Sequence, residues 1–283
     1  MHVLLTGGTG YIGSSVLRRL LDQGHDVTAV VRSDESARAV RDAGAEPSVG
    51  DITDVAWLTE LLRDADGAIH LAAGDDSAAI DDAVLDAVIA AFAGTDKPFV
   101  HTGGIWSWGD NPEIHEHAPL APPQLTAWRG EREQRILDAD VHASVVSPGI
   151  VHGYGKGIPQ GVIVGAPRDA GGRLELVGSG EQRWATVHVD DLAELYVLAL
   201  TRSGKGERWI GASGHNPTVR ELGEVVAGGA GVAPVSEDAV RERLGAGFAD
   251  ALLLDQASSG SKAREVLGWA PSRPTLVEEL RGA

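Results

Sequence analysis

Three glycines near the start of this chain have a spacing that suits phosphate binding. Gly7, Gly10 and Gly13 follow a short apolar run and open an amphipathic segment. The first permits a tight turn, the second lets the backbone approach a pyrophosphate, and the third lets a helix pack closely on a strand. A helix beginning near Tyr11 would also direct its amide groups at the anion. The alternative is a structural glycine-rich turn. We expect a dinucleotide site comprising Gly7, Thr9, Gly10, Tyr11, Ile12 and Gly13.

A basic residue stands where this kind of motif has an acidic one. Arg32, followed by Ser33, lies about 20 positions after the glycines, at the end of the next expected strand. An acidic residue there accepts from the ribose hydroxyls of NAD, whereas a guanidinium forks well onto a 2′-phosphate. We therefore expect both residues to contact the cofactor and NADP(H) to be favoured over NAD(H). The alternative is that Arg32 only stacks on adenine or pairs with Asp34 or Glu35.

Composition narrows the classes of partner. The net charge of −17 argues against nucleic acid or an anionic membrane as a general partner. The chain has no cysteine, which excludes disulfides, a thiol nucleophile and zinc–thiolate sites. No apolar run reaches the ~18 residues that span a bilayer, and no signal peptide is visible. We expect a cytoplasmic protein with a small-molecule substrate, and a homodimer is left open.

Strand-like and helix-like segments alternate through the first half of the chain. The expected strands are 2–6, 26–32, 46–49, 67–72, 98–102 and 142–147, and the expected helices are 11–23, 34–43, 54–63, 77–94 and 125–139. This alternation predicts an α/β fold with a Rossmann-type, doubly wound parallel sheet. Glycine and proline become frequent after Pro148. We therefore expect a dinucleotide-binding core at 1–150, late sheet elements from 186–211, and a mostly substrate-binding, loop-rich lobe at 151–283.

Motifs along nearly the whole chain point to one family. They are Thr6–Gly13, Gly50–Asp54, Ile69–Ala73, Ser147–Gly153, Val187–Ala193 and Lys262–Pro271. In order and spacing they resemble the extended short-chain dehydrogenase/reductase family, also called the NAD-dependent epimerase/dehydratase family. The resemblance implies that Asp51 and Ile52 contact adenine. It implies that the cofactor cleft is lined by Leu71, Ala72 and Ala73, and that Pro148, Gly149 and Ile150 lie beside the nicotinamide.

The catalytic positions of that family are altered here. Alignment at Gly109 puts Gly104 where the family has a catalytic hydroxyl, which leaves Thr102 and Ser107 as candidates to replace it. The family's Tyr-x-x-x-Lys pair falls on Trp128 and Arg132. An indole cannot exchange a proton as a phenol does, and a guanidinium does not deprotonate. Arg132 can still hold ribose hydroxyls or a substrate anion.

Histidines are the other candidate proton carriers, because they titrate near neutrality. The candidates are His101, His115, His117, His152 and His188. We place His117 with Thr102, Ser107 and Arg132 in the candidate catalytic set, because we expect its loop to overhang the cleft. A metal site at His115-Glu116-His117 is the less favoured interpretation, since this spacing in a loop is more often a solvated turn.

Tryptophans surround the expected nicotinamide end. Trp106, Trp108 and Trp128 favour a flat apolar or aromatic substrate, although buried tryptophan is more often core. Tyr154 is a further pocket candidate, with simple packing as its alternative. Two classes of function remain open. One is an atypical NADP(H)-dependent oxidoreductase or epimerase acting on a small carbonyl or hydroxyl compound. The other is a dinucleotide-binding protein without redox turnover, or a non-redox enzyme that reuses the pocket.

Overall fold

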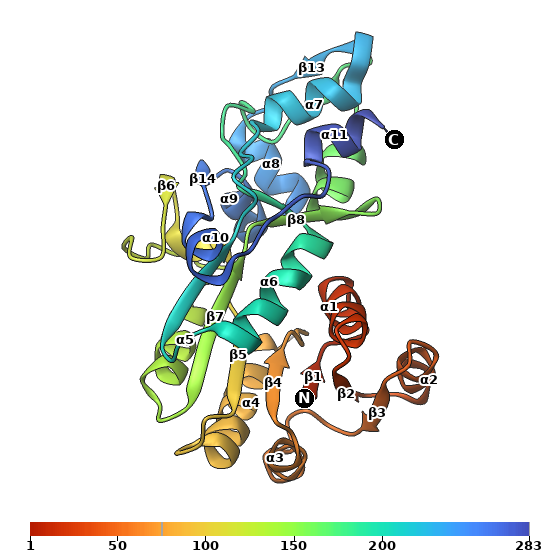
Figure 1. Ribbon diagram of the computed structural model, residues 1–283. Coiled ribbons are helices and arrows are strands. Elements are labelled where there is room, and N and C mark those ends of the chain that lie inside the picture. Colours follow the sequence, from red (N-terminus) through yellow and green to blue (C-terminus); the bar gives the residue numbers. More distant parts are fainter. Residues whose placement is uncertain (75, 283) are drawn as a thin grey trace.

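The centre of the molecule is a seven-stranded parallel sheet in the order β12-β7-β5-β4-β1-β2-β3. The computed structural model describes residues 1–74 and 76–282 (Figure 1). The sheet strands are β1 (His2–Thr6), β2 (Asp26–Val31), β3 (Glu46–Val49), β4 (Gly67–His70), β5 (Pro98–Thr102), β7 (His142–Pro148) and β12 (Glu207–Gly211). The chain winds outward from β1 in both directions, which confirms the predicted Rossmann-type fold.

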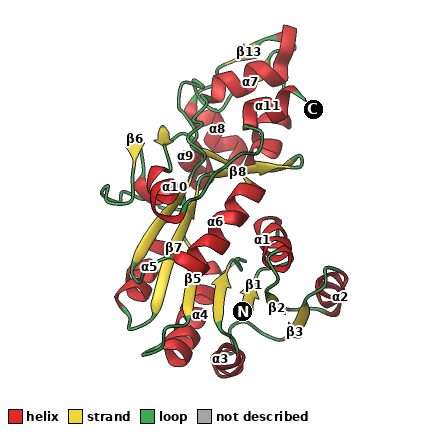
Figure 2. Cartoon of the chain, in the orientation of Figure 1, coloured by secondary structure: helices red, strands yellow, loops and turns green. Residues whose placement is uncertain are grey.

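Helices cover both faces of this sheet (Figure 2). One face packs on α1 (Tyr11–Asp22), α2 (Asp34–Asp42), α6 (Val189–Arg202) and α10 (Ser261–Leu267). The other packs on α3 (Val55–Asp64), α4 (Ser77–Phe92) and α5 (Arg129–Asp138). Val3, Leu4 and Leu5 of β1 are all buried, because consecutive side chains of a central strand point into the two opposite cores.

A smaller lobe lies beyond the carboxyl ends of the strands, at the top of Figure 1. Its apolar centre joins Ile150, Trp184, Val219 and Leu276, which are far apart in the sequence. Its strands are β8 (Ile150–Gly153), β9 (Lys156–Gly157), β10 (Leu174–Glu175), β11 (Thr186–His188) and β13 (Val232–Ala233). Its helical segments are η2 (Gln160–Val164), α7 (Val219–Ala227), η3 (Gly228–Ala230), α8 (Glu237–Leu244), α9 (Ala246–Leu252) and α11 (Leu276–Arg281). A short 3₁₀ turn η1 (Ile105–Trp108) leads to β6 (Asn111–Ile114), which pairs with β14 (Gln256–Ser258).

One predicted boundary was wrong by several residues. The helix expected at 125–139 begins at Arg129, and the residues before it form turns. Turns occupy residues 124–128, and residue types alone do not distinguish these turns from a first turn of helix. Trp128 is consequently the N-cap of α5 rather than a residue within the helix. No helix among the described residues is long and apolar enough to cross a membrane.

Candidate functional site

The glycine loop between β1 and α1 is shaped by close backbone contacts. Gly7 has a φ of +73°, and a Cβ there would lie 2.6 Å from the Ala72 backbone nitrogen. A Cβ at Gly13 would overlap the Gly7 carbonyl oxygen, so only glycine lets α1 approach the loop this closely. The Gly10 N–H donates to that same oxygen at 2.9 Å. These contacts give the loop the tight turn and close helix packing that a dinucleotide site requires.

The N-terminus of α1 is open to an anion. Its N-cap is Gly10, which has no side chain to accept from the first amides, and the first turn holds no acidic residue. Those N–H groups therefore receive no side-chain cap, and the positive end of the dipole of a 12-residue helix lies behind them. Thr9 and Gly10 are exposed at the loop surface, and Ile12 packs against the sheet core. Tyr11 instead donates its hydroxyl to the Gly153 carbonyl at 2.9 Å, which ties the loop to the lobe.

The end of β2 presents a basic side chain. Arg32 is exposed, and the structure gives it no ion pair with Asp34 or Glu35 within the described residues. Ser33 caps α2 by accepting from the Ser36 N–H at 3.2 Å. Asp34 and Glu35 lie in the first turn of α2, where a carboxylate is favoured by the helix dipole. The guanidinium is thus left available to a phosphate group.

The adenine side of the expected cleft is a turn after β3. The Asp51 carboxylate accepts from the Thr53 N–H at 2.9 Å and from the Thr53 hydroxyl at 2.7 Å. These two hydrogen bonds lower the pKa of Asp51. Ile52 packs on the core beneath the turn. Both residues lie where the resemblance implies adenine contacts, but the Asp51 carboxylate already holds the turn in shape.

The segment after β4 is fixed by a threonine hydroxyl. Leu71 and Ala72 donate their backbone N–H groups to Thr6 Oγ1 at 3.2 and 3.3 Å. Leu71 and Ala72 are half-buried, and Ala73, which follows them, is exposed. The floor of the expected cleft is therefore attached to the last residue of β1.

The end of β7 is a buried junction between the sheet and the lobe. Pro148, Gly149 and Ile150 are all buried. A Cβ at Gly149 would overlap the Ala185 carbonyl oxygen, which accepts from the Ile150 N–H at 2.7 Å. The chain is held closely here, so this junction is a rigid wall of the expected nicotinamide end.

The two candidate hydroxyls have different environments. Thr102 Oγ1 donates to the His70 carbonyl at 2.6 Å and lies 2.9 Å from the Tyr196 hydroxyl. Because the threonine proton is used on the carbonyl, Tyr196 is the donor of the second bond. Ser107 is buried within η1, and its hydroxyl has no partner among the described residues. The space that a Cβ on Gly104 would occupy is empty, so the position aligned with the family hydroxyl is a gap.

Trp128 and Arg132 lie together but do not form an acid–base pair. Arg132 donates to the Trp128 carbonyl at 2.8 Å and to the Ala78 carbonyl at 3.2 Å, and it pairs with Asp82. Its fork therefore joins α5 to α4. The Trp128 indole N–H donates to Leu125 O at 3.1 Å, and the Arg129 guanidinium lies 4.4 Å from the ring. The indole has a cationic neighbour in Arg129, but it has no proton that titrates as that of a phenol does.

The five candidate histidines divide by exposure. His115 and His117 are exposed, and the Glu116 between them accepts from the Ile210 N–H at 3.1 Å on β12. His152 is buried against Glu279 at 2.7 Å, and burial lowers the pKa of its imidazole. His188 caps α6 by accepting from Asp190 N–H at 3.1 Å. In the described ranges, one group of three His, Asp or Glu residues has its potential ligand atoms within 4.8 Å of one another. It comprises His70, Asp81 and His101.

The aromatic candidates do not form one surface. Trp108 is 1% exposed and packs under the loop with its indole N–H unpartnered among the described residues. Trp106 is half-buried and meets Phe248 of the lobe edge-on, with ring centroids 6.0 Å apart. Tyr154 is exposed, with a φ of +59°, and donates to Asp190 at the start of α6. Trp106 and Trp128 remain the candidates with a partly open ring.

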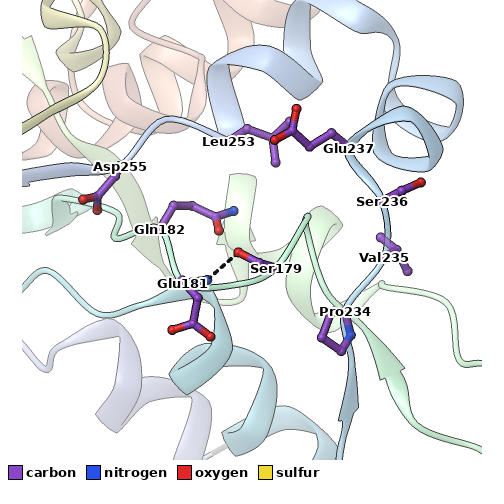
Figure 3. Close-up of a pocket in the computed structure, with 9 residues that line it drawn as sticks. All are labelled: Ser179, Glu181, Gln182, Pro234, Val235, Ser236, Glu237, Leu253 and Asp255. Carbon is purple, nitrogen blue, oxygen red and sulfur yellow. Dashed lines mark hydrogen bonds between the residues drawn. The ribbon is translucent and has the colours of Figure 1, made fainter.

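A separate hollow lies in the lobe, and Figure 3 shows the residues that line it: Ser179, Glu181, Gln182, Pro234, Val235, Ser236, Glu237, Leu253 and Asp255. None of the predicted site residues lines it. Its acidic side chains are paired: Glu181 with Arg220, Glu237 with Arg241, and Asp255 with Arg183. It therefore offers no free charge to a ligand.

Sequence reasoning missed three residues of the site region. Tyr196 reaches Thr102 from α6, although it reads as one apolar position of an amphipathic helix. Arg129 donates to the Thr102 carbonyl at 3.1 Å. Asp81 lies on an otherwise apolar face of α4 and is only 3% exposed. The signal in the sequence is a charged residue among the apolar positions of that face. A charged residue on an apolar helix face is visible in a sequence, but its partners are not.

Comparison with known proteins fits this geometry. The family model described as NAD(P)H-binding matches residues 7–149. An uncharacterised protein of Saccharomyces cerevisiae, YLL056C, is 30% identical over 99% of this chain and 98% of its own length. The UDP-glucose 4-epimerase of Mycolicibacterium smegmatis is 30% identical over 96% of this chain and 94% of its own. The crystal structure of human epimerase family protein SDR39U1 with NADPH superposes with a TM-score of 0.75 at 21% identity, covering 100% and 98% of the two chains.

The glycine cradle, the parallel sheet and these full-length similarities agree with one another. The chain belongs to the NAD(P)H-binding proteins of the extended short-chain dehydrogenase/reductase, or NAD-dependent epimerase/dehydratase, family.

Proposed function

We propose that this protein is an NADP(H)-dependent oxidoreductase or epimerase for a small, apolar or aromatic carbonyl or hydroxyl compound. It would work without the Tyr-x-x-x-Lys pair. The observation that carries the proposal is the uncapped N-terminus of α1 together with an exposed Arg32 that has no ion pair within the described residues. A helix N-terminus and a free guanidinium together suit a dinucleotide with one additional phosphate.

The residues fit that cofactor. Gly7, Gly10 and Gly13 would hold the pyrophosphate, and Arg32 with Ser33 the 2′-phosphate. Leu71 to Ala73 and Pro148 to Ile150 would line the nicotinamide half. When bound, the nicotinamide supplies or accepts a hydride. The crystal structure of human SDR39U1 with NADPH supports the same choice of cofactor.

Proton transfer is the altered part of the site. The Thr102 proton is held by a carbonyl, and Arg132 is committed to α4. Of the predicted catalytic residues, Ser107 has an unpartnered hydroxyl within the described residues and His117 is exposed, so these two are the proposed proton carriers. Arg132 and Thr102 would then position the walls of the site rather than exchange protons.

The proposed substrate class rests on the aromatic side chains near the altered catalytic positions in the sequence. Trp106 and Trp128 offer flat, half-buried rings, and Arg129 lies against one of them. Such surfaces suit an apolar or aromatic compound, and the cation suits a polarised oxygen. The Mycolicibacterium relative is a UDP-glucose 4-epimerase. A nucleotide sugar is the less favoured substrate for this chain, since it would require several polar and cationic groups in the pocket.

A second candidate is dinucleotide binding without turnover. It is favoured by the engagement of Thr102 and Arg132 in structural hydrogen bonds. One experiment separates the two: NADPH fluorescence is followed on mixing with protein, and then with a panel of aromatic and aliphatic ketones and aldehydes. We expect binding followed by oxidation with at least one aromatic carbonyl. Binding with no oxidation across the panel would favour the second candidate, and no binding would overturn both.

A further inference from the structure

A buried polar cluster lies beneath the expected cofactor cleft and takes no part in the proposed chemistry. Asp81 of α4 stands between two histidines, His70 at the end of β4 and His101 on β5. The distances are 3.0 Å from His70 Nε2 to Asp81 Oδ1 and 3.4 Å from His101 Nε2 to Asp81 Oδ2. The three residues are at most 3% exposed. The two rings stack with their centroids 5.6 Å apart.

The cluster is connected to the glycine loop through Thr6. His70 Nδ1 lies 2.7 Å from Thr6 Oγ1, and that oxygen already accepts from Leu71 N–H and Ala72 N–H. With its acceptor side occupied by two amides, the hydroxyl donates its one proton to His70 Nδ1. His70 must then carry its own proton on Nε2 and donate it to Asp81. The hydrogen bonds therefore fix the tautomer of a fully buried histidine.

The direction of the hydrogen bonds at His70 disfavours a metal ion between His70, Asp81 and His101. A metal bound at His70 Nε2 would require the proton on Nδ1, where Thr6 is the donor. A closed site also needs four ligands, and the described residues bring only three together. Burial lowers the pKa of His70, which keeps its ring neutral. Burial acts to raise the pKa of Asp81, but its contacts with His101 and His70 outweigh that effect and lower it, so the carboxylate stays ionised as an acceptor.

We propose that Asp81 is a positioning residue for the dinucleotide cleft. By accepting from His70 Nε2–H it holds the imidazole whose Nδ1 orients the Thr6 hydroxyl, and this hydroxyl fixes the Leu71–Ala72 backbone. That backbone lies against Gly7, where even a Cβ would be 2.6 Å from Ala72 N. The His70 carbonyl also accepts from Thr102, so one histidine joins the ends of β1, β4 and β5. The inference rests on the proposed function in so far as this cleft holds the cofactor.

The chemistry of the bond predicts which substitutions are tolerated. An amide at position 81 still offers an oxygen to His70 Nε2–H and an N–H₂ group to His101, whereas leucine of similar size offers neither. We expect Asp81→Leu to raise the Kd for NADPH about tenfold, the equivalent of losing one hydrogen bond to a charged group. Asp81→Asn should stay within about threefold of wild type. Asp86→Asn, an exposed position on the same helix, is the matched control.

The decisive readout is spectroscopic and needs no cofactor. Proteins labelled with ¹⁵N-histidine should show His70 as the neutral Nε2–H tautomer in wild type and Asp81→Asn, assigned by its loss in His70→Gln. Amide exchange at Ala72 should be faster in Asp81→Leu and in Thr6→Val, with Thr6→Ser like wild type, whereas the Leu71 N–H keeps the Thr6 carbonyl at 3.2 Å as a second acceptor. The Thr6 variants keep the test valid if Asp81→Leu does not fold.

Several outcomes would overturn the inference. They are an Nδ1–H tautomer, equal damage from Asn and Leu at position 81, unchanged exchange in Thr6→Val, or stoichiometric zinc in the isolated protein. If wild type failed to bind NADPH, the proposed function would fall. The tautomer and exchange results would still decide the role of Asp81.

Discussion

The two ends of the expected cleft differ in how far their residues keep the features that the family would require. At the expected phosphate end, Gly7 and Gly13 make backbone contacts that no other residue could make, and Arg32 is exposed with no ion pair among residues 1–74 and 76–282. At the expected proton-transfer end, Trp128 and Arg132, which we predict to stand in place of the family's Tyr and Lys, are held by structural hydrogen bonds. The comparison teaches that holding a cofactor and using it depend on separable sets of residues. A sequence can keep the first while the second is rebuilt.

The largest effect should come from breaking the phosphate end. Gly13→Val places a side chain on the Gly7 carbonyl oxygen and separates α1 from the loop. We expect NADPH affinity to fall by ~100-fold or more, with about 1–3 kcal/mol of stability lost to overpacking. Gly10→Val should be milder in packing, because its Cβ would lie 3.2 Å from the same oxygen, but it still blocks the phosphate. Calorimetric titration and urea unfolding measure the two effects. Gly229→Ala is the control, since its Cβ meets open space, and wild-type affinity in Gly13→Val would show that the cradle is elsewhere.

The next effect concerns the rebuilt end. Wild type should reduce simple ketones slowly, because we expect Ser107 and His117 to supply only part of the ~10²–10⁴-fold gain that a well-placed acid–base pair typically contributes. The double substitution Trp128→Tyr with Arg132→Lys restores that pair, and we expect turnover to rise about 10²-fold. Single-turnover rates with saturating NADPH measure it. If wild type is already fast, and Ser107→Ala or His117→Ala abolishes its activity while Trp128→Phe does not, the proposed carrier on the loop after β5 replaces the family pair fully, and the expected gain from the double substitution would be absent.

The preference for NADPH over NADH tests the role of Arg32 at the expected phosphate end. Arg32→Asp removes the guanidinium and introduces a carboxylate that can accept from ribose hydroxyls. The preference for NADPH over NADH should fall by about 1–3 kcal/mol, the range of one charge-assisted contact. Fluorescence titration of both cofactors against both proteins gives the ratio. Equal affinity of wild type for the two cofactors would contradict the role assigned to Arg32.

The smallest expected effect is a pH dependence of stability. Burial lowers the pKa of His70 and His152 below the ordinary 6.5. Below pH 6.5 the unfolded chain binds protons that the native rings do not, so the free energy of unfolding should decrease as the pH falls from 7.5 to 5. Each ring contributes a slope of up to about 1.4 kcal/mol per pH unit. Urea unfolding measures this slope, and His152→Gln should reduce it. A flat profile over that range would mean that both rings titrate normally.

The fold was largely predictable from the sequence, because the patterns that specify it are local. The apolar run Val3–Leu5 and the glycines after it predicted β1, the turn and α1, and the sheet confirmed the fold class. The start of α5 was misplaced because residue types alone do not distinguish the turns at 124–128 from a first turn of helix. The His70–Asp81–His101 cluster could not be predicted, since its members come from three elements and only the topology brings them together. Predicted roles for Ser107, His117 and the tryptophans remain predictions.

The path of the chain between the sheet and the lobe has a consequence for how the protein can change. The lobe core is made from three stretches, around 150–184, 219–252 and 276. Between them, Leu192–Leu200 with Trp209, and then Ala263–Trp269, return to pack on the sheet. A single proteolytic cut therefore cannot release the lobe, and the lobe cannot be replaced by exchanging one continuous segment of the chain. A change of substrate preference is therefore expected to come from side-chain substitutions in the lobe, while the sheet and the lobe stay connected by several crossings of the chain.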